Sequence, residues 1–181
     1  MRLVVTLAFL IFCLTAIFYK ESLVKLFSDE AEVKILQDQY QKHDIGLFFI
    51  QNIFFDYKGF PVSNIAFNKF DQSQDIIIHF WASWCAPCIN EIPELLNFKN
   101  KFQNNNNILF ITISLDDENE QIEKFLKSFK EFNNEDFIKI WDKSKLTMKK
   151  FNIDRLPMTV FIKGSEVRVV RGVVDWKALI L

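Results

Sequence analysis

The chain has few of the residues on which several common kinds of binding site depend. Only four of its 181 residues are glycine, and it has no glycine-rich loop of the kind that cradles nucleotide phosphates. The formal net charge is -1 and no basic stripe is present, which argues against a nucleic-acid partner. With two histidines and three cysteines, a zinc site with four ligands has few residues to draw on. The composition therefore directs attention to chemistry that needs neither phosphate nor metal.

Two of the cysteines lie three positions apart in the segment 84–88, which reads Trp-Cys-Ala-Pro-Cys. Thiols at this spacing can close into a disulfide and reopen, so a two-electron redox site is the leading interpretation. The apolar run 76–81 predicts a buried strand, and a helical stretch begins at about Cys88. Cys85 then lies at a helix N-terminus, which stabilises a thiolate and lowers its pKa. We expect Cys85 to be the nucleophile and the inward-facing Cys88 the resolving thiol.

Besides coincidence, two other interpretations of this cysteine pair remain open. A zinc site needs further ligands, and the candidates are Cys13, inside an apolar run, and the histidines His43 and His79. A permanent structural disulfide would close a loop too short to stabilise the fold much in the chain-entropy model. Redox chemistry is the stronger interpretation.

Residues 79–88 and 91–93 resemble the thioredoxin superfamily, and more narrowly its membrane-anchored TlpA/ResA branch. That branch places a glutamate three residues after the second cysteine and a proline two residues further on, as this chain does. Residues 155–162 are similar to the loop in which the family carries a cis-proline facing the disulfide, so Pro157 is the candidate. The resemblance covers residues 46–176 and implies a thiol:disulfide oxidoreductase.

The resemblance implies an α/β thioredoxin-like fold, in which helices flank a central mixed β-sheet, with an N-terminal β-hairpin and a short central insert. Hydrophobic periodicity gives an alternating order of strands and helices, which predicts a parallel central pair of strands. The expected helices are 88–102, bent at Pro93, 120–132 and 145–151; the expected strands are 47–55, paired with 56–62 in the hairpin, then 76–81, 108–115, 137–141, 159–162 and 167–171.

Residues 3–19 form an uncharged apolar stretch at the short limit for a membrane span. A cleaved signal peptide is the alternative, but no clear small-x-small cleavage site follows. We expect residues 1–20 to be a membrane anchor or uncleaved signal, 21–45 a stalk or linker, and 46–181 the thioredoxin-like domain. Arg2 favours an N-terminus on the inner side, which places the domain on the periplasmic or extracytoplasmic side of a bacterial inner membrane after a single pass.

Two ionisable residues are expected near the disulfide. His79 lies six residues before Cys85, where thioredoxins carry a buried aspartate and the TlpA/ResA branch usually an asparagine. Our hypothesis is that neutral His79 accepts the proton of Cys88, and the alternative is a buried histidine with backbone or water partners. Glu91 matches the active-site carboxylate of the branch, whose charge would raise the cysteine pKa values. The alternative is a first-turn glutamate that complements the helix dipole.

A groove for a partner protein is expected beside the cysteines. Alternation along the strand directs Trp81 into the core, whereas Trp84 comes just before Cys85 and would flank the groove. The resemblance places the partner's backbone beside Leu156 and Pro157. We expect Met158 to line the same groove, with ordinary sheet packing as the alternative.

Together these features predict a membrane-tethered enzyme that reduces disulfides of exported or periplasmic proteins. The resemblance implies substrates of the cytochrome c maturation or copper-site assembly type, with electrons from a membrane thiol reductase. No cofactor and no metal ion is expected. The alternatives are a thiol peroxidase, a non-catalytic docking or chaperone module, and a disulfide oxidase or isomerase, although the Ala-Pro pair lacks the histidine of strongly oxidising relatives. Residues 177–181, after Trp176, are expected to give a single turn of cover.

Overall fold

The computed structural model describes residues 40–62, 74–102, 108–133 and 137–179. The predicted anchor and most of the predicted stalk lie outside these ranges. The last residues of that stalk, 40–45, belong to the same unit as the sheet. None of the helices in the described ranges is long and apolar enough to cross a membrane.

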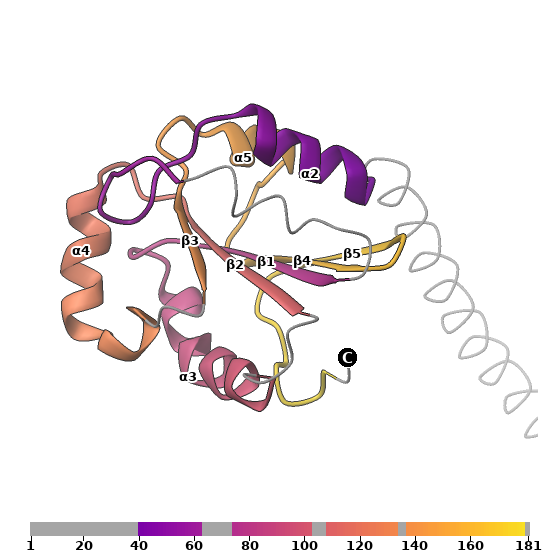
Figure 1. The fold of residues 1–181 in the computed structure, drawn as a ribbon. Helices are drawn as coiled ribbons and strands as arrows, with labels where there is room; N and C mark the ends of the chain where they lie inside the picture. The colour runs from indigo at the N-terminus through magenta and orange to yellow at the C-terminus, as the bar shows by residue number, and fades with distance from the viewer. Residues whose placement is uncertain (1–39, 63–73, 103–107, 134–136, 180–181) are drawn as a thin grey trace, which may run out of the picture. The chain divides into compact units, whose positions relative to one another are not determined.

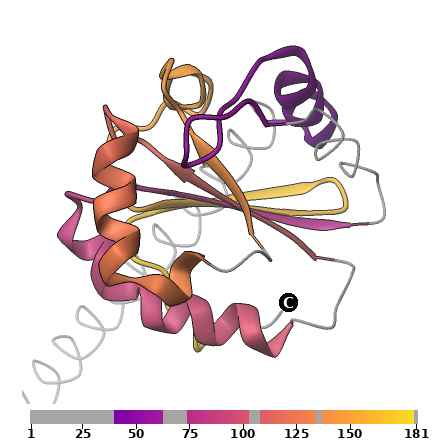
Figure 2. The ribbon, with the colours of Figure 1, turned by 60° about the vertical axis from the view of Figure 1, so that its left-hand side comes forward.

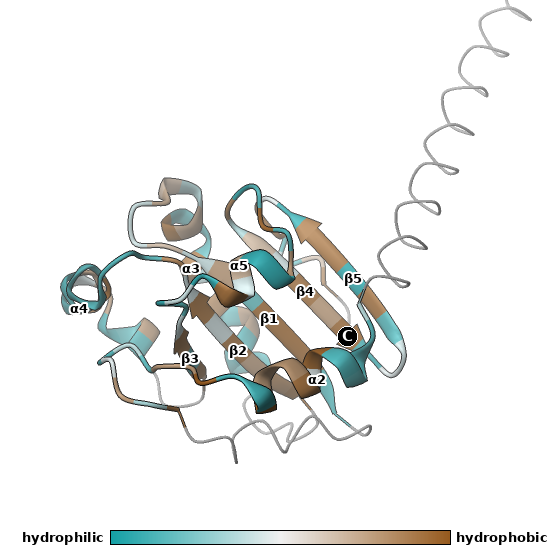
Figure 3. Ribbon diagram, turned by 90° about the horizontal axis from the view of Figure 1, so that it is seen from above, coloured by the Kyte–Doolittle hydropathy of each residue, from teal (hydrophilic) through white to brown (hydrophobic). Residues whose placement is uncertain are grey.

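Five strands make up the sheet: β1 (Asp75–Trp81), β2 (Ile108–Ser114), β3 (Ile138–Trp141), β4 (Met158–Lys163) and β5 (Glu166–Arg171). Their order across the sheet is β3-β2-β1-β4-β5 (Figure 1). β1 pairs in parallel with β2 and antiparallel with β4, so the predicted mixed sheet with a parallel central pair is confirmed. β1 and β2 read as continuous apolar runs because both of their faces are buried, and they are brown along most of their length in Figure 3.

Helices cover both faces of this sheet (Figures 1 and 2). One face carries α3 (Ala86–Lys101) and α4 (Asn119–Ser128), and α4 is followed by a short 3-10 helix, η2 (Lys130–Asn133). The other face carries α2 (Lys42–Gln51) and α5 (Leu146–Lys150). The order of these helices and strands along the chain places the start of α3 directly after β1, at the carboxyl end of the central strand.

Side chains alternate along β1, so His79 and Trp81 lie on the face covered by α3 and Phe80 lies on the other. Trp81 packs with the buried residues of α3, whereas the ring of Phe80 lies 5.1 Å from that of Phe151 on the opposite face. His79 is two residues from Trp81 and therefore faces α3 as well. An imidazole is thus directed to the same side of the sheet as Cys88.

The predicted strand 47–55 is wrong, because residues 42–51 form the helix α2. Its buried residues Ile45 and Phe49 are four positions apart, the spacing of one helix face. A short apolar run fits a strand or a helix equally well, and contact with the rest of the core decides between them. Here the ring of Phe49 packs on that of Phe54, with centroids 5.1 Å apart.

The expected N-terminal hairpin is reduced to a single antiparallel bridge between Phe55 and Pro61. Phe55 also forms a bridge with Trp141, so this segment adds to the β3 edge of the sheet. Residues 137–141, expected as a short extended segment, supply that edge strand itself.

Tyr57, in the turn of this segment, connects it to the core. Its hydroxyl accepts a hydrogen bond from Nε1 of Trp81 at 2.7 Å and donates to Oγ1 of Thr112 at 2.9 Å. All three side chains are buried, so each polar atom depends on this chain of bonds. The N-terminal segment is therefore fixed to the two central strands, next to the residues that lead to the cysteines.

The other expected helices are present, with changes at their ends. The helix predicted at 88–102 begins at Ala86 and runs through Pro93 to Lys101. The helix predicted at 120–132 ends at Ser128, and η2 takes up the remaining residues. The predicted closing hairpin is confirmed as β4 and β5.

Candidate active site

Cys85 and Cys88 are joined by a disulfide with an S–S length of 2.04 Å at the N-terminus of α3. Cys85 is the N-cap residue, and its sulfur accepts a hydrogen bond from the backbone N–H of Cys88 at 3.3 Å. Pro87 lies in the first turn, where its missing N–H removes no helical hydrogen bond. Cys88 is fully buried and Cys85 is 5% exposed. Cys85 is therefore the less buried of the two cysteines.

The Leu156–Pro157 peptide bond is cis, as predicted, and directly precedes β4. β4 is the antiparallel neighbour of β1, which leads to the cysteines. A pocket of about 430 Å³ opens beside Trp84, which is 64% exposed. It is lined by Trp84, Leu115, Asp117, Lys145, Met148, Ile153, Asp154, Arg155 and Leu156. Trp84 and Leu156 thus share one groove, whereas Pro157 and the two cysteines are not among its lining residues.

Met158 does not line this groove, because its side chain is fully buried. It lies directly opposite Phe80 in the β1–β4 ladder, so it points to the face of the sheet away from α3. Nη1 of Arg171 lies 3.3 Å from its sulfur. The alternative of ordinary sheet packing applies to Met158.

His79 and Glu91 face each other between β1 and α3, and both are buried. Nε2 of His79 lies 3.4 Å from Oε1 of Glu91, and Nδ1 lies 3.0 Å from the hydroxyl of Thr159. Oε2 of Glu91 accepts hydrogen bonds from the backbone N–H of Val174 at 3.2 Å and from Nε1 of Trp176 at 3.1 Å. Among the described residues, Oε1 has no hydrogen-bond partner. Glu91 is therefore a buried carboxyl beside an imidazole, and not a surface charge that complements the helix dipole.

Burial shifts the pKa of both groups toward their neutral forms. It lowers the pKa of His79 from 6.5 to about 3. It raises the pKa of Glu91 from 4.5 to about 7, against the hydrogen bonds from Val174 and Trp176, which lower it, while the charge of Glu94 adds to the rise. Between these two values the pair holds one proton. Near pH 7 it can release or accept that proton.

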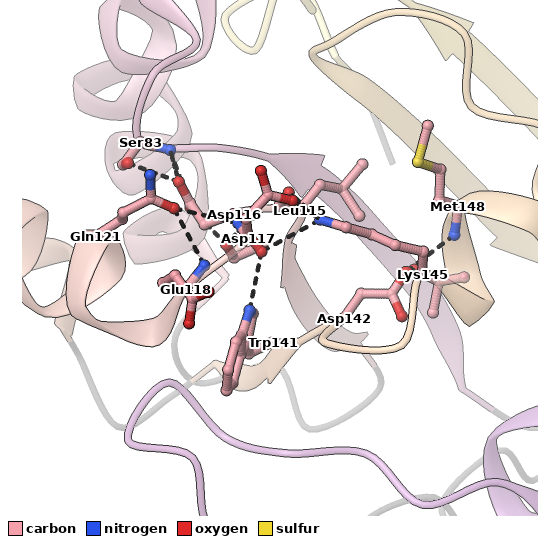
Figure 4. A network of polar contacts seen from close by, with 12 residues as sticks. Ser83, Leu115, Asp116, Asp117, Glu118, Gln121, Trp141, Asp142, Lys145 and Met148 are labelled. Atoms are coloured by element: carbon pink, nitrogen blue, oxygen red, sulfur yellow. Dashed lines mark hydrogen bonds and ion pairs between the residues drawn. The ribbon is translucent and has the colours of Figure 1, made fainter.

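A second buried acid, Asp116, holds the loop that carries the cysteines (Figure 4). Its two oxygens accept from the backbone N–H of Ser83 at 3.0 and 3.1 Å and from the Ser83 hydroxyl at 2.6 Å. The hydroxyl of Ser114 donates to it at 2.6 Å. Ser83 lies in the turn closed by the bond from the N–H of Cys85 to the carbonyl of Ala82, at 3.1 Å. The carboxylate thus fixes the path of the chain into α3.

A side chain from β3 and that of Lys145, the N-cap residue of α5, hold the backbone carbonyls after β2 (Figure 4). Nε1 of Trp141 donates to the carbonyl of Asp116 at 2.9 Å, and Nζ of Lys145 donates to the carbonyl of Leu115 at 2.7 Å. Nζ of Lys145 also lies 3.0 Å from a carboxylate oxygen of Asp117. Lys145 does this from a left-handed backbone conformation with φ of 54°, which few residues other than glycine adopt. The backbone after β2, which forms part of the groove, is therefore held by side chains from β3 and from the N-cap of α5.

Neither Asp116 nor Trp176 was predicted as a site residue from the sequence. Asp116 had a usable signal, because it follows a strand that runs parallel to the one ending at the cysteines, and parallel strands end at the same edge. Trp176 had no such signal, since 85 positions separate it from Glu91.

Residues 74–169 match the family described as thioredoxin-like, a range that includes both cysteines and the cis-proline. The chain is 27% identical over 92 residues to sporulation thiol-disulfide oxidoreductase A of Bacillus subtilis (strain 168), covering 51% of this chain and 54% of that protein. It is 23% identical over 103 residues to thiol-disulfide oxidoreductase ResA of the same organism, covering 56% of this chain and 55% of that protein. The chain thus spans about half the length of the curated relatives it matches.

Among solved structures, a secreted disulfide oxidoreductase of Mycobacterium tuberculosis is similar, with a TM-score of 0.56 and 16% sequence identity. The match covers 71% of this chain and 91% of that chain. At this level of identity the similarity concerns the fold alone.

Proposed function

Because the chain belongs to the thioredoxin-like family and has the fold predicted from its motifs, we propose that it is a thiol:disulfide oxidoreductase that reduces partner proteins through Cys85 and Cys88. The observation that carries this proposal is the setting of the disulfide. It lies at a helix N-terminus, with Cys88 fully buried and Cys85 retaining 5% exposure. The names of the two curated relatives agree with this activity.

The reaction takes two exchange steps. In the reduced protein, the Cys85 thiolate attacks one sulfur of the partner's disulfide, which forms a mixed disulfide and releases the first partner thiolate. Cys88 then loses its proton and attacks the sulfur of Cys85, which forms the internal disulfide and releases the second partner thiolate. Two electrons pass from the two cysteines to the partner, and the released thiolates take protons from solvent.

The position of Cys85 favours the first of these steps. The backbone N–H of Cys88 already donates to its sulfur, and the N-terminus of α3 adds the positive end of the helix dipole. Both interactions are stronger with a thiolate than with a thiol, so they lower the pKa of the attacking group.

The second step needs an acceptor for the proton of Cys88, and we assign it to the pair formed by Glu91 and His79. Cys88 is fully buried, so its proton has no direct exit to water. Glu91 lies one turn further along the same buried face of α3. Since the pKa of Glu91 is raised to about 7 and that of His79 is lowered to about 3, Glu91 is the acceptor and His79 shares the proton. This revises the hypothesis that His79 accepts the proton alone.

The partner binds in the groove between Trp84 and Leu156 in this proposal. Extended segments commonly pair with exposed backbone, and the backbone at Leu156 and Pro157 is the candidate for such pairing. Trp84 offers a large exposed apolar surface directly before the attacking cysteine.

We also propose that the protein works at a bacterial inner membrane, anchored by residues 3–19 in a single pass with the catalytic domain on the periplasmic side. The length and lack of charge of that stretch support this. In an oxidising compartment a dithiol drifts toward the disulfide, so a membrane thiol reductase is the proposed electron donor. Haem-binding cysteines of apocytochrome c and thiols of copper-site assembly are the proposed substrate classes.

The deciding measurement is the reduction potential of the Cys85–Cys88 couple in the full chain, equilibrated against glutathione and thioredoxin. A value near that of thioredoxin, about -270 mV, supports a reductase, whereas a value near about -120 mV makes the protein an oxidant. A Cys88→Ser variant is expected to trap partners on Cys85 as mixed disulfides, and a Cys85→Ser variant is not. Partner binding that survives loss of both thiols would instead support a docking module.

A further inference from the structure

The C-terminal segment 172–179 lies beyond the range that matches the family, yet it runs alongside α3 (Figure 1). It leaves β5 at Gly172, whose N–H donates to the carbonyl of Pro157 at 2.8 Å. The φ of Gly172 is +112°, a conformation suited to glycine. From there the segment continues to Glu91. It therefore connects the cis-proline loop to the buried carboxyl beneath the disulfide.

Both hydrogen bonds from this segment reach the same oxygen of Glu91. Val174 and Trp176 donate to Oε2, at 3.2 and 3.1 Å. Two donors on one oxygen fix the orientation of the carboxylate, and they leave Oε1 directed at Nε2 of His79, 3.4 Å away. The C-terminal segment thus determines which oxygen faces the imidazole.

The indole of Trp176 has little freedom to turn away from Glu91. It is 1% exposed, and its ring lies 5.2 Å from that of Phe98 on α3 and 6.0 Å from that of Phe110 on β2. It also lies 6.1 Å from the ring of Phe161 on β4 and 5.8 Å from the imidazole of His79, the latter in an edge-on arrangement. One side chain therefore contacts both members of the buried pair and is held in place by the core around them.

We propose that Trp176 is a positioning residue for proton transfer at the disulfide: its indole N–H orients the Glu91 carboxylate toward His79 and favours the ionised form that accepts the proton of Cys88. This rests on the proton role assigned above to Glu91 and His79. Without the indole N–H, the backbone of Val174 is the one donor left on Oε2 among the residues that the structure describes. The hydrogen bond from Trp176 acts in the required direction, since it lowers the pKa of Glu91.

The other ionisable groups around Glu91 come from β1, α3 and the C-terminal segment. His79 faces it from β1, with the uncharged Thr159 of β4 behind the imidazole. Glu94 lies three residues further along α3, and its charge raises the pKa of Glu91. Lys177, in the C-terminal segment, lies 2.7 Å from a carboxylate oxygen of Glu94. The segment therefore acts on Glu91 directly through Trp176 and indirectly by pairing the neighbouring charge.

The first test needs no variant. In the oxidised full-length protein, the indole N–H signals of the four tryptophans are followed by ¹⁵N NMR, and the side-chain carboxyl carbon of Glu91 is followed by ¹³C NMR. The Trp176 signal is expected to move with Glu91, with a midpoint near pH 7. Trp141, which donates to a backbone carbonyl, serves as the internal control and is expected to stay in place. A Glu91 that titrates while the Trp176 signal does not move overturns the proposal.

The second test compares Trp176→Phe with Trp141→Phe, the same change at a tryptophan that does not touch Glu91. The probe is the attack of Cys88 on a thionitrobenzoate mixed disulfide at Cys85, timed by release of the coloured thiol across a range of pH. Trp176→Phe is expected to move the midpoint of this profile upward by about one pH unit, which corresponds to tenfold slower release on the rising limb. Trp141→Phe is expected to leave the midpoint unchanged. Equal midpoints in the wild type and Trp176→Phe contradict the proposal.

A third variant separates this proposal from the one on which it rests. If Glu91→Gln removes the pH step and Trp176→Phe does not move it, the pair accepts the proton but Trp176 does not position it. If Glu91→Gln also leaves the step in place, the assigned proton role fails, and the proposal for Trp176 fails with it. Failure of Cys85 to react with the probe at all would reject the oxidoreductase function itself. If Trp176→Phe does not fold, the NMR titration of the wild type still decides.

Discussion

Two buried acids flank the disulfide, and they differ in how completely their oxygens are satisfied. Both oxygens of Asp116 accept hydrogen bonds, from the backbone and hydroxyl of Ser83 and from the hydroxyl of Ser114. Glu91 has two donors on one oxygen, and within the described part of the chain it has none on the other, which faces His79. A carboxylate surrounded by donors fixes the backbone that supplies them. A carboxyl with one free oxygen, buried beside an imidazole, is suited to taking up a proton.

The two acids therefore have different roles at one site: Asp116 holds the backbone in place, and Glu91 takes part in proton transfer. Asp116 holds the chain just before the disulfide, because it binds Ser83 in the turn that leads to Cys85. Glu91 lies just after the disulfide in the chain, one helical turn beyond Cys88. Changes on the Asp116 side should therefore appear mainly in stability, and changes on the Glu91 side mainly in the pH dependence of thiol exchange.

The largest effect on stability is expected from Asp116→Ala, which leaves three donors without an acceptor: the hydroxyl of the buried Ser114, and the backbone N–H and hydroxyl of the half-buried Ser83. Each unsatisfied buried group costs about 1–3 kcal/mol, and water entering the space offsets part of this, so a loss of about 3 kcal/mol in the free energy of unfolding is expected. Urea denaturation measures it. Asp117→Ala is the matched control, because the Asp117 side chain is 80% exposed and its pair with Lys145 lies at the surface. That variant should lose less than about 1 kcal/mol. Equal losses of unfolding free energy in the two variants would show that the hydrogen bonds of Asp116 do not hold the loop before Cys85.

On the other side of the disulfide, Glu91→Gln is expected to slow the attack of Cys88 on a mixed disulfide by about 10- to 100-fold, since an amide cannot accept its proton. The step in the rate near pH 7 should disappear. Stability should change less than in Asp116→Ala, because an amide oxygen still accepts the bonds from Val174 and Trp176. Glu94→Gln, which removes a nearby charge that is not in contact with His79, is the control and should retain the step. If the pH profile of Cys88 attack were unchanged in Glu91→Gln, Glu91 would not be the proton acceptor.

The pair of His79 and Glu91 also predicts how stability depends on pH. The unfolded chain binds one proton on His79 between about pH 4.5 and pH 6.5, and the folded pair holds one proton over the same range, so the wild type should be nearly flat there. Replacing one of the two residues makes the pH dependence of the other visible. In Glu91→Gln, His79 has a lowered folded pKa, so stability should fall as the pH drops from 6.5 toward 3. In His79→Asn, Glu91 has a raised folded pKa, so stability should fall as the pH rises from 4.5 through 7.

Each of these slopes should amount to about 1–2 kcal/mol across its range, and thermal unfolding at a series of pH values measures them. The sign is the informative result, because the two variants must change in opposite directions. The same slope in both variants would show that the two groups do not share one proton.

The contrast between the two acids also explains what the sequence could predict. The cysteines, the cis-proline at Pro157 and the inward direction of His79 follow from local spacing and from a motif, and the structure has them where they were expected. Glu91 was expected near the disulfide, but its donors come from a segment more than 80 residues away. Such a contact depends on how the chain returns to α3 and leaves no local pattern. The helix α2 was missed for a related reason, since its short apolar run fits a strand until its packing is known.

The smallest effect is expected from Ser114→Ala, which tests whether loss of a donor has the same consequence at Asp116 as at Glu91. Ser114→Ala removes one donor from Asp116 and also the hydroxyl that accepts the N–H of Asp116 at 3.1 Å. The remaining bonds from Ser83 keep both oxygens occupied, so the loss in unfolding free energy should be about 1 kcal/mol. The pH profile of Cys88 attack should keep its midpoint, in contrast to Trp176→Phe, which also removes one donor from one buried acid. If both variants shifted the midpoint alike, any loss of a donor near the disulfide would alter its chemistry, and the proton role would not belong to Glu91 in particular.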